Sequence, residues 1–283
     1  MSSTRDASNP IHKICDAHIH FFPARLMEAI LDWFVQQGWT MPYRQQSVET
    51  LLNYLESIGV TSAFVLGYIR QKDKSAGINL WLKDLCEQYS WLHPFAALHQ
   101  DDTELEKILS QALDEWNFPG VKIHTFVQQV AANDKRLWPM YRMLSERRKG
   151  IILHLGGLPT ETPYTRVDSL QDVLKSFPNL KVTIAHMGLP HEFSLAVKLA
   201  ACYANVYLDT AYLLGNPRLP LQEEWLKAID AYPTKFIFGT DFPIMDYSPR
   251  DAIQAVNLLP LSKEVKTQLL WDNAMRFLHT EKS

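Results

Sequence analysis

The chain alternates short apolar runs rich in Val, Ile and Phe with longer stretches in which apolar residues recur at helical spacing. Each short run reads as a buried strand, and a predicted amphipathic helix follows each one. The predicted strands cover residues 14–20, 61–67, 92–98, 120–125, 150–157, 181–187, 205–210 and 235–241. Eight strands that each precede a helix, in a chain of 283 residues, are what a (β/α)8 barrel requires. We therefore expect an α/β protein with the TIM-barrel fold.

The predicted architecture is a single domain. No linker, internal repeat or break in composition divides the chain, so the barrel is expected over residues 14–278, after an N-terminal extension at 1–13. An open, doubly wound sheet is the alternative architecture. It would not bring the first, fifth, sixth and eighth strands around a common point, whereas a barrel does.

Composition argues against several classes of function. The formal net charge of −3 provides no basic field for nucleic acid or for an anionic membrane surface. No window approaches the roughly 18 apolar residues of a transmembrane helix, and residues 1–10 lack a signal core. The three cysteines are too far apart for a Cys-x-x-Cys site. We expect a cytoplasmic enzyme with a small-molecule substrate, and homodimer formation is left open.

Two histidines stand at the end of the first predicted strand. In an extended chain residues i and i+2 project from one face with Cα atoms about 6.5 to 7 Å apart. His18 and His20 could therefore both reach one metal at about 2.1 Å. His154, His186 and Asp241 end the fifth, sixth and eighth predicted strands. Because the carboxyl ends of barrel strands converge on one face, we expect a metal site there.

Motifs at these positions resemble the amidohydrolase superfamily. They are Asp16-x-His18-x-His20, a His on the fifth strand, Ala185-His186-Met187-Gly188, Gly239-Thr240-Asp241-Phe242-Pro243 and Asp272-Asn273-Ala274-x-Arg276-Phe277-Leu278. The resemblance extends from residue 14 to residue 278. It is to the amidohydrolase-related branch that includes aminocarboxymuconate semialdehyde decarboxylase, related aromatic acid decarboxylases and pyrone dicarboxylate lactonase.

The resemblance implies one divalent ion, zinc or alternatively manganese, held by His18, His20, His154 and Asp241. It also implies that His186 is the acid/base residue that handles the metal-bound water, while Asp241 alternates between ligand and proton acceptor. The chemistry agrees, since neutral imidazoles and a carboxylate suit either ion. Metal-bound water has a pKa near 7, and a His with a reference pKa of about 6.5 can shuttle its proton.

The predicted fourth strand bears on whether the site holds one metal ion or two. Lys122 and His124 share parity, so both can face the barrel interior. In binuclear members of the superfamily a fourth-strand Lys is carbamylated and bridges two metals, and His154 and His186 would then both be ligands. The alternative is that Lys122 is a buried, hydrogen-bonded or ion-paired amine and His124 a substrate contact. The other motifs resemble the single-metal branch, so we expect one ion.

Candidate substrate contacts lie at the same face. Arg70, just after the second predicted strand, could clamp a carboxylate with two parallel hydrogen bonds, or it could be a solvated surface arginine. Phe22 follows the ligand pair directly, and Tyr212 lies beyond the seventh predicted strand. The long segment 24–46 is expected to form either a lid or binding element or ordinary barrel packing.

The ligand set fits two reactions. We expect a metal-dependent hydrolase that acts on a small ester, lactone or amide through metal-activated water. The alternative is a nonoxidative decarboxylase of an unsaturated or aromatic acid. A dedicated set of arginines around the leaving carboxylate would indicate decarboxylation, and Arg70 alone does not meet this requirement. A non-catalytic binding barrel is disfavoured, because an intact ligand set has little purpose there.

Overall fold

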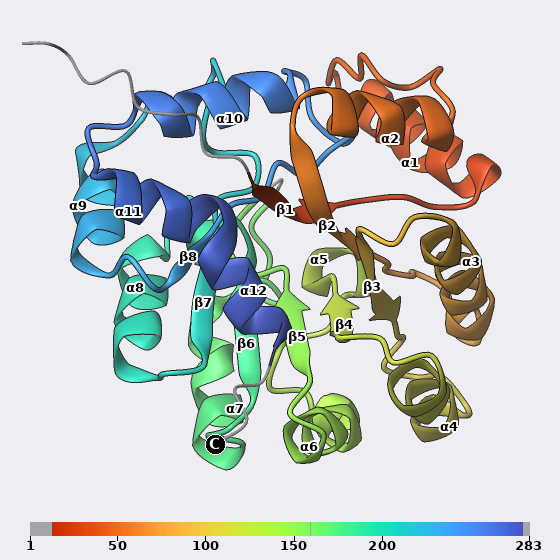
Figure 1. Ribbon diagram of the computed structural model, residues 1–283. Helices are drawn as coiled ribbons and strands as arrows, with labels where there is room; N and C mark the ends of the chain where they lie inside the picture. The colour runs from red at the N-terminus through yellow and green to blue at the C-terminus, as the bar shows by residue number, and fades with distance from the viewer. Residues whose placement is uncertain (1–12, 159, 280–283) are drawn as a thin grey trace, which may run out of the picture.

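One sheet of parallel strands forms the centre of the computed structural model, which describes residues 13–158 and 160–279. Its strands are β1 (Ile14–Ile19), β2 (Val60–Leu66), β3 (Leu92–Ala97), β4 (Gly120–Ile123), β5 (Gly150–Leu153), β6 (Lys181–Ile184), β7 (Val206–Asp209) and β8 (Phe236–Ile237). They pair in chain order from β1 to β8 (Figure 1). The predicted α/β barrel is therefore confirmed. The expected N-terminal extension lies outside the described residues, apart from Lys13.

Main-chain hydrogen bonds join the first and last strands and close the barrel. Ala17 N donates to Phe238 O at 2.9 Å, and Asp241 N donates to His18 O at 2.8 Å. The pairing continues past the short regular part of β8 as far as Phe242. The open, doubly wound sheet is thereby excluded, because its edge strands would not meet.

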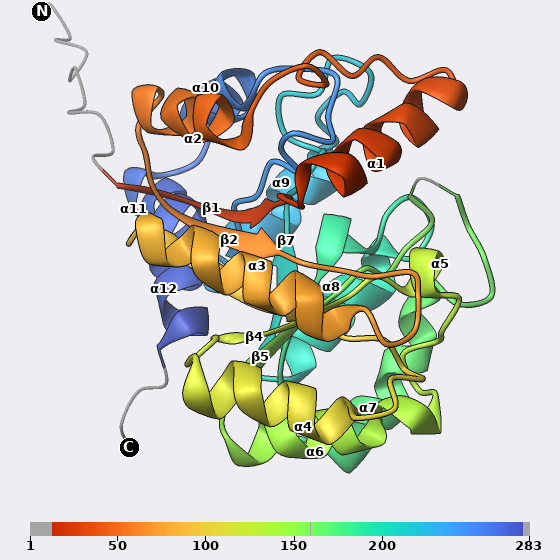
Figure 2. The same ribbon diagram turned by 90° about the vertical axis from the view of Figure 1, so that its right-hand side faces the viewer.

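Helices surround the sheet and connect its strands. They are α1 (Ala24–Gln36), α2 (Val48–Ser57), α3 (Ser75–Gln88), α4 (Leu105–Ser110), α5 (Thr125–Gln128), α6 (Trp138–Glu146), α7 (Leu170–Ser176), α8 (Phe193–Cys202), α9 (Glu223–Ala231), α10 (Pro249–Leu258), α11 (Lys263–Thr267) and α12 (Asn273–Leu278). Short 3-10 or π turns are η1 (Gln111–Glu115), η2 (Lys135–Leu137), η3 (Val167–Ser169), η4 (Ala185–Gly188) and η5 (Gln268–Asp272). Helix α1 follows β1 and extends toward the carboxyl ends of the strands (Figure 2).

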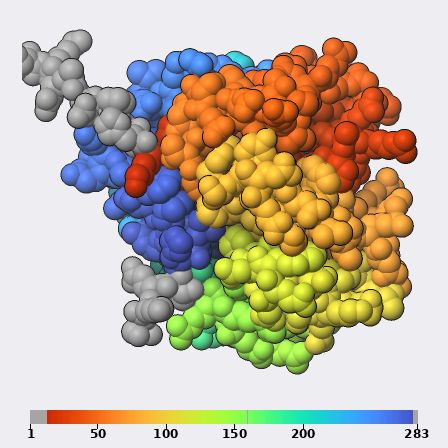
Figure 3. All heavy atoms as spheres, turned by 45° about the vertical axis from the view of Figure 1, so that its right-hand side comes forward, coloured from red at the N-terminus to blue at the C-terminus, as the bar shows by residue number. Residues whose placement is uncertain are grey.

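The surface follows the same circular order as the strands. In Figure 3, the orange, yellow and green segments form adjacent patches, and the blue C-terminal segment lies beside the orange one. Serine side chains cap three of the helices: Ser47, Ser248 and Ser262 accept hydrogen bonds from backbone N–H groups in the first turns of α2, α10 and α11. No helix within the described ranges is long and apolar enough to cross a membrane.

A β-bulge in β1 changes which of its residues face the barrel interior. From Asp16 to Ile19, β1 advances three residues while its neighbour β2 advances two, from Ala63 to Val65. Odd-numbered residues before the bulge belong to the interior cluster, whereas Ile19 packs in the cluster between strands and helices. The extra residue shifts the period of two. Even-numbered positions after the bulge therefore face inward, and these carry the two candidate histidine ligands.

Aromatic packing fills the barrel at the amino ends of its strands. Phe277 of α12 stacks on Phe64 and Phe95, with ring centroids 6.2 Å apart in both pairs. Helix α12 also approaches Gly150 so closely that a Cβ there would lie 2.4 Å from the Phe277 ring. This end of the barrel is therefore filled, and the polar side chains gather at the other end.

The close approach of β4 and β5 can be tested by its effect on stability. A Cβ at Gly120 would lie 2.0 Å from the carbonyl oxygen of Gly150, between β4 and β5. Gly120→Ala should lower the free energy of unfolding by about 3 kcal/mol, because the two strands must separate. Urea denaturation followed by circular dichroism measures this. Gly77→Ala in α3 is the control, since its Cβ would meet open space, and it should be neutral or stabilising by up to about 1 kcal/mol. Equal midpoints for both variants would contradict the close approach of the strands.

Candidate metal centre

Five polar side chains meet at the carboxyl ends of four strands. His18 and His20 come from the end of β1, His154 follows β5, His186 lies in η4 after β6, and Asp241 follows β8. All four histidines are buried, and the Asp241 side chain is 16% exposed. The donor atoms of His18, His186 and Asp241 lie within 4.8 Å of one another. The structure thus brings together the residues that the sequence assigns to the centre.

Three donor atoms have the spacing of ligands around one ion. His18 Nε2 and His20 Nε2 are 3.1 Å apart. Asp241 Oδ1 lies 3.5 Å from His18 Nε2 and 3.1 Å from His20 Nε2. Ligands at about 2.1 Å in a tetrahedral zinc site are separated by about 3.4 Å. The observed distances fit such an ion with little rearrangement.

Hydrogen bonds on the outer sides of the rings fix which nitrogen faces the centre. His18 Nδ1 lies 2.8 Å from Asp209 Oδ2, and His20 Nδ1 lies 2.9 Å from Leu66 O. A carbonyl and a carboxylate only accept hydrogen bonds, so both Nδ1 atoms carry the proton. Both Nε2 atoms then direct lone pairs toward Asp241. Three electron-rich atoms at this spacing repel one another, and a divalent cation between them removes the repulsion.

Hydrogen bonds also fix the tautomers of a second pair of rings, His186 and His154. His186 Nδ1 donates to Ala211 O at 3.0 Å, and His154 Nε2 donates to Leu158 O at 2.6 Å. The two remaining nitrogens, His186 Nε2 and His154 Nδ1, face each other at 3.2 Å. Both rings therefore present an unprotonated nitrogen, as a ligand or a base must. The predicted division, with His154 as ligand and His186 as acid/base residue, stays a prediction.

Burial lowers the pKa of two of the histidines, whereas close neighbours lower the pKa of Asp241. Burial, reinforced by the positive charge of Lys122, holds the pKa of His18 well below its usual range. The pKa of His154 is lowered in the same direction, by burial first. Burial raises the pKa of Asp241, but its close contacts with the His20 and His18 rings outweigh burial and leave this pKa below its ordinary value. Neutral imidazoles and a carboxylate are the forms that bind zinc or manganese.

Lys122 lies next to this group. Its side chain is fully buried, and its Nζ is 3.4 Å from His18 Nε2. Burial lowers the pKa of Lys122 to about 8, against the opposing effect of Asp209 and Asp241. The amine is therefore placed beside a candidate ligand, and its role as a carbamate bridge stays a prediction.

The backbone at the centre is strained in several places. His186, Met187, Tyr212 and Asp241 have φ angles of 53°, 52°, 67° and 75°, in the left-handed region that residues with a Cβ seldom adopt. Asp209 holds the first of these turns, because its Oδ1 accepts from His186 N at 2.9 Å. A side chain on a regular strand could not take these directions. The strain therefore goes together with the positioning of the candidate catalytic groups.

Two adjoining cavities open onto the centre. The smaller, of about 50 Å³, is lined by His20, His154, His186 and Asp241 and by several aromatic side chains. The larger, of about 680 Å³, lies beyond it, and three residues line both: Phe34, Tyr68 and His124. The segment 24–46 contributes to both cavities through α1. It is thus a wall of the site.

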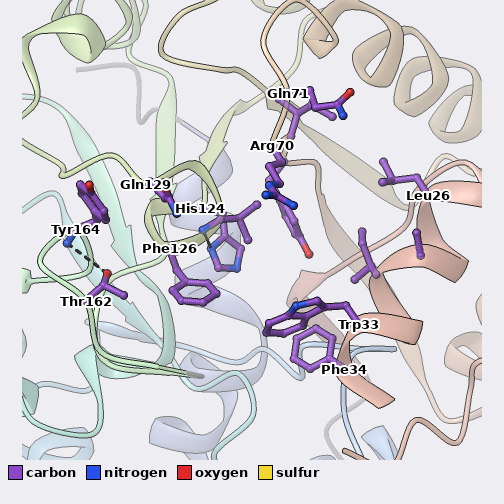
Figure 4. A pocket seen from close by; sticks show the side chains of 15 residues that line it. Leu26, Trp33, Phe34, Arg70, Gln71, His124, Phe126, Gln129, Thr162 and Tyr164 are labelled. Atoms are coloured by element: carbon purple, nitrogen blue, oxygen red, sulfur yellow. Dashed lines mark hydrogen bonds between the residues drawn. The ribbon is translucent and has the colours of Figure 1, made fainter. Parts of the chain in front are cut away.

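The predicted substrate contacts lie in different parts of these cavities. His124 stacks on His154, with centroids 3.8 Å apart, and lines both cavities. Arg70 lines the larger cavity (Figure 4), and Tyr212 lines the smaller. Phe22 is fully buried behind His20, and among the described residues it is not part of either lining. Their roles in substrate binding stay predictions.

Two important residues escaped the sequence analysis. Asp209 orients His18 and holds the backbone of His186. The rule that identified the ligands also applies to it, because Asp209 is the last residue of β7. Tyr68 lines both cavities, and no sequence pattern separates it from other aromatic residues near strand ends.

The chain is similar to a known protein family and to several solved structures. The family model described as amidohydrolase matches residues 15–280. An uncharacterized TIM-barrel protein from Bordetella bronchiseptica is 21% identical, with a TM-score of 0.75, over 94% of this chain and 98% of that chain. The 5-carboxyvanillate decarboxylase of Sphingomonas paucimobilis is 12% identical, with a TM-score of 0.71, over 94% and 99%. The 4-oxalomesaconate hydratase of Rhodopseudomonas palustris is 15% identical, with a TM-score of 0.65, over 94% and 95%. These structures share the fold.

The orienting carboxylate of Asp209 can be tested by substitution. In Asp209→Asn the amide oxygen still accepts from backbone N–H groups, so the amide NH2 faces His18 Nδ1. His18 must then move its proton to Nε2, which removes a lone pair from the centre. Zinc affinity, measured by competition with a chromophoric chelator, should fall by about 10- to 100-fold.

Asp16→Asn is the matched control. Asp16 is equally buried, but it accepts from Thr240 and from the backbone of His18, and it does not bond to an imidazole ring. This variant should retain zinc affinity. Unchanged affinity in Asp209→Asn, or the same loss in both variants, would contradict the role given to Asp209.

Proposed function

The chain belongs to the amidohydrolase family, and from this premise we propose that it is a metal-dependent hydrolase of a small ester, lactone or amide. The observation that carries the proposal is the convergence of unprotonated histidine nitrogens on the Asp241 carboxylate. His18, His20, His154 and Asp241 would hold one divalent ion, zinc or alternatively manganese. When bound, such an ion supplies a Lewis acid that polarises a carbonyl and lowers the pKa of water.

His186 is the proton-transfer residue of this proposal. Its Nδ1 donates to Ala211 O, which fixes the tautomer and leaves Nε2 as the basic atom. Nε2 takes a proton from water as the carbonyl is attacked, and returns the proton to the leaving group. Asp241, ionised and partly exposed to the smaller cavity, accepts the second proton of the water, which the newly formed carboxylic acid releases. Aromatic side chains around this cavity limit the access of bulk water.

Nonoxidative decarboxylation of an unsaturated or aromatic acid is the second candidate. It draws on the shared fold of 5-carboxyvanillate decarboxylase, at 12% identity, and of 2,6-dihydroxybenzoate decarboxylase, at 14% identity. The lining of the two cavities favours hydrolysis instead. Arg70 is the single arginine among the described residues that line them, and it lies in the cavity away from the metal centre.

Metal content and turnover separate the roles of two histidines. Wild-type protein purified without chelator should hold one zinc or manganese ion per chain by elemental analysis. His186→Asn should retain the ion and lose turnover by roughly 10²- to 10⁴-fold, the usual effect of removing a general acid or base. His154→Asn should lose the ion as well. Turnover is measured on the best substrate from a panel of lactones, esters and carboxylated aromatic acids.

Two outcomes would overturn these assignments. Equal loss of metal from both variants would make His186 a ligand. A content near two ions per chain would assign Lys122 the bridging role, and no ion after reconstitution with zinc or manganese would reject the metal centre.

Labelled water distinguishes the two reactions. Single turnover in oxygen-18 water should place the label in the new carboxylate, because the oxygen of water adds to the carbonyl carbon. An unlabelled organic product together with stoichiometric carbon dioxide would instead establish decarboxylation. Mass spectrometry of the product and of the released gas provides both readings from one sample.

A further inference from the structure

The loop after β7, residues 210–222, sets the tautomer of the proposed proton-transfer residue. Its Ala211 O accepts from His186 Nδ1 at 3.0 Å, which leaves His186 Nε2 free to take up a proton. The next residue, Tyr212, has a φ of 67° and lines the smaller cavity. Because a tyrosine seldom adopts this conformation, the turn must be held by contacts from its surroundings.

Asn216 holds this turn from within the same loop. Its side chain is buried, its Nδ2 donates to Tyr212 O at 3.0 Å, and its Oδ1 accepts from Arg218 N at 2.9 Å. The carbonyl can only accept and the backbone N–H can only donate, so these two partners fix the orientation of the amide. The backbone of Arg218 is thereby joined to the turn that carries Ala211 O.

The Arg218 side chain forms an ion pair with the loop after β8. Its Nη1 lies 2.7 Å from Asp246 Oδ2, and the Asp246 side chain is 3% exposed against 56% for Arg218. In the described part of the chain, no second ion pair engages Asp246, and its Oδ1 has no hydrogen-bond partner. A buried carboxylate is costly to leave without its cation. The position of Arg218 is therefore strongly determined by Asp246.

Asp246 is held in place independently of the loop after β7. On one side of it, Phe242 O accepts from His20 N at 2.7 Å. On the other side, the Ser248 hydroxyl bonds to Tyr54 of α2 at 2.6 Å. The loop after β8 is thus a fixed support, and the ion pair transmits its position to the loop after β7.

We propose that Arg218 and Asn216 are positioning residues of the reaction. Together they hold the turn at Tyr212, so that Ala211 O stays against His186 Nδ1 and His186 Nε2 stays unprotonated. This inference rests on the proposed role of His186. If Ala211 O moves away, the ring can carry its proton on Nε2 instead, and it then cannot take a proton from water there.

Nitrogen-15 NMR of the imidazole rings tests the proposal without turnover. In the zinc-loaded wild type, His186 should show a protonated Nδ1 and an unprotonated Nε2, and His186→Asn identifies these signals by their loss. Arg218→Gln and Asn216→Ala should each raise the share of rings protonated at Nε2 by about tenfold, roughly the effect of losing one hydrogen bond on an equilibrium.

Turnover provides a second reading. In both variants kcat should fall by about tenfold while KM stays within about twofold, because the proton-transfer group is displaced and neither altered residue is part of the described lining of the two cavities. Arg218→Lys should recover most of both readings, since a single contact between Nη1 and the carboxylate needs a cation and not a fork of donors.

Arg147→Gln is the matched control. It removes an ion-paired arginine that follows α6 at the amino end of β5, opposite the centre. It should change neither the His186 signals nor kcat. Circular dichroism and zinc content identify the variants that remain folded, and Asn216→Ala and Arg218→Gln test the same turn by separate contacts.

Three results would overturn the proposal: His186 signals that stay as in the wild type in either variant, the same change in Arg147→Gln, or no recovery in Arg218→Lys. A failure of the proposed function is recognised separately, from loss of metal in His186→Asn or from the absence of oxygen-18 in the product.

Discussion

The direction of the imidazole lone pairs is the constraint on which the centre depends. His18 and His20 each donate Nδ1–H outward, to Asp209 and to the Leu66 carbonyl, and thus turn an unprotonated nitrogen inward. These nitrogens approach each other to 3.1 Å beside the Asp241 carboxylate. In a buried, low-dielectric environment such an approach is unfavourable without a positive charge, and the Lys122 amine, 3.4 Å from His18 Nε2, supplies part of that charge. The fold therefore holds a group of side chains whose mutual repulsion is available to stabilise a bound cation.

The barrel can maintain this arrangement because one of its ends is packed with apolar side chains and the other holds the polar groups. Phe277 and its aromatic neighbours fill the amino end with tightly packed apolar surface. The strained φ angles of His186, Tyr212 and Asp241 are all at the opposite end. Such conformations persist only where surrounding contacts determine them. A main-chain hydrogen bond from Asp241 N to His18 O, and one from His186 N to the Asp209 carboxylate, provide those contacts and link strands that are distant in sequence.

The sequence predicted the order of strands and helices well, because periodicity and strand-end polarity are local signals. The expected strand 92–98, for example, corresponds to β3, which ends one residue earlier at Ala97. The expected strand 235–241 is regular only over Phe236–Ile237, and the next N–H, that of Phe238, donates outside the sheet to Leu269 O. The bulge in β1 could not be predicted either. It exists because β1 has one residue more than β2 over the same stretch, and this depends on both strands. Asp209 could have been identified, because it obeys the strand-end rule that selected the other candidates.

Recognition and chemistry come from different parts of the chain. Strand ends provide every candidate ligand and proton-transfer group, and their positions are fixed by closure of the barrel. The segment between β1 and β2 instead provides Phe34, which lines both cavities, and Trp33, which lines the larger one. A helix packed beside the barrel can change its side chains without disturbing the strand hydrogen bonds. The side chains of α1 can therefore vary while the candidate metal ligands stay in place, which separates the shape of the cavities from the arrangement of the centre.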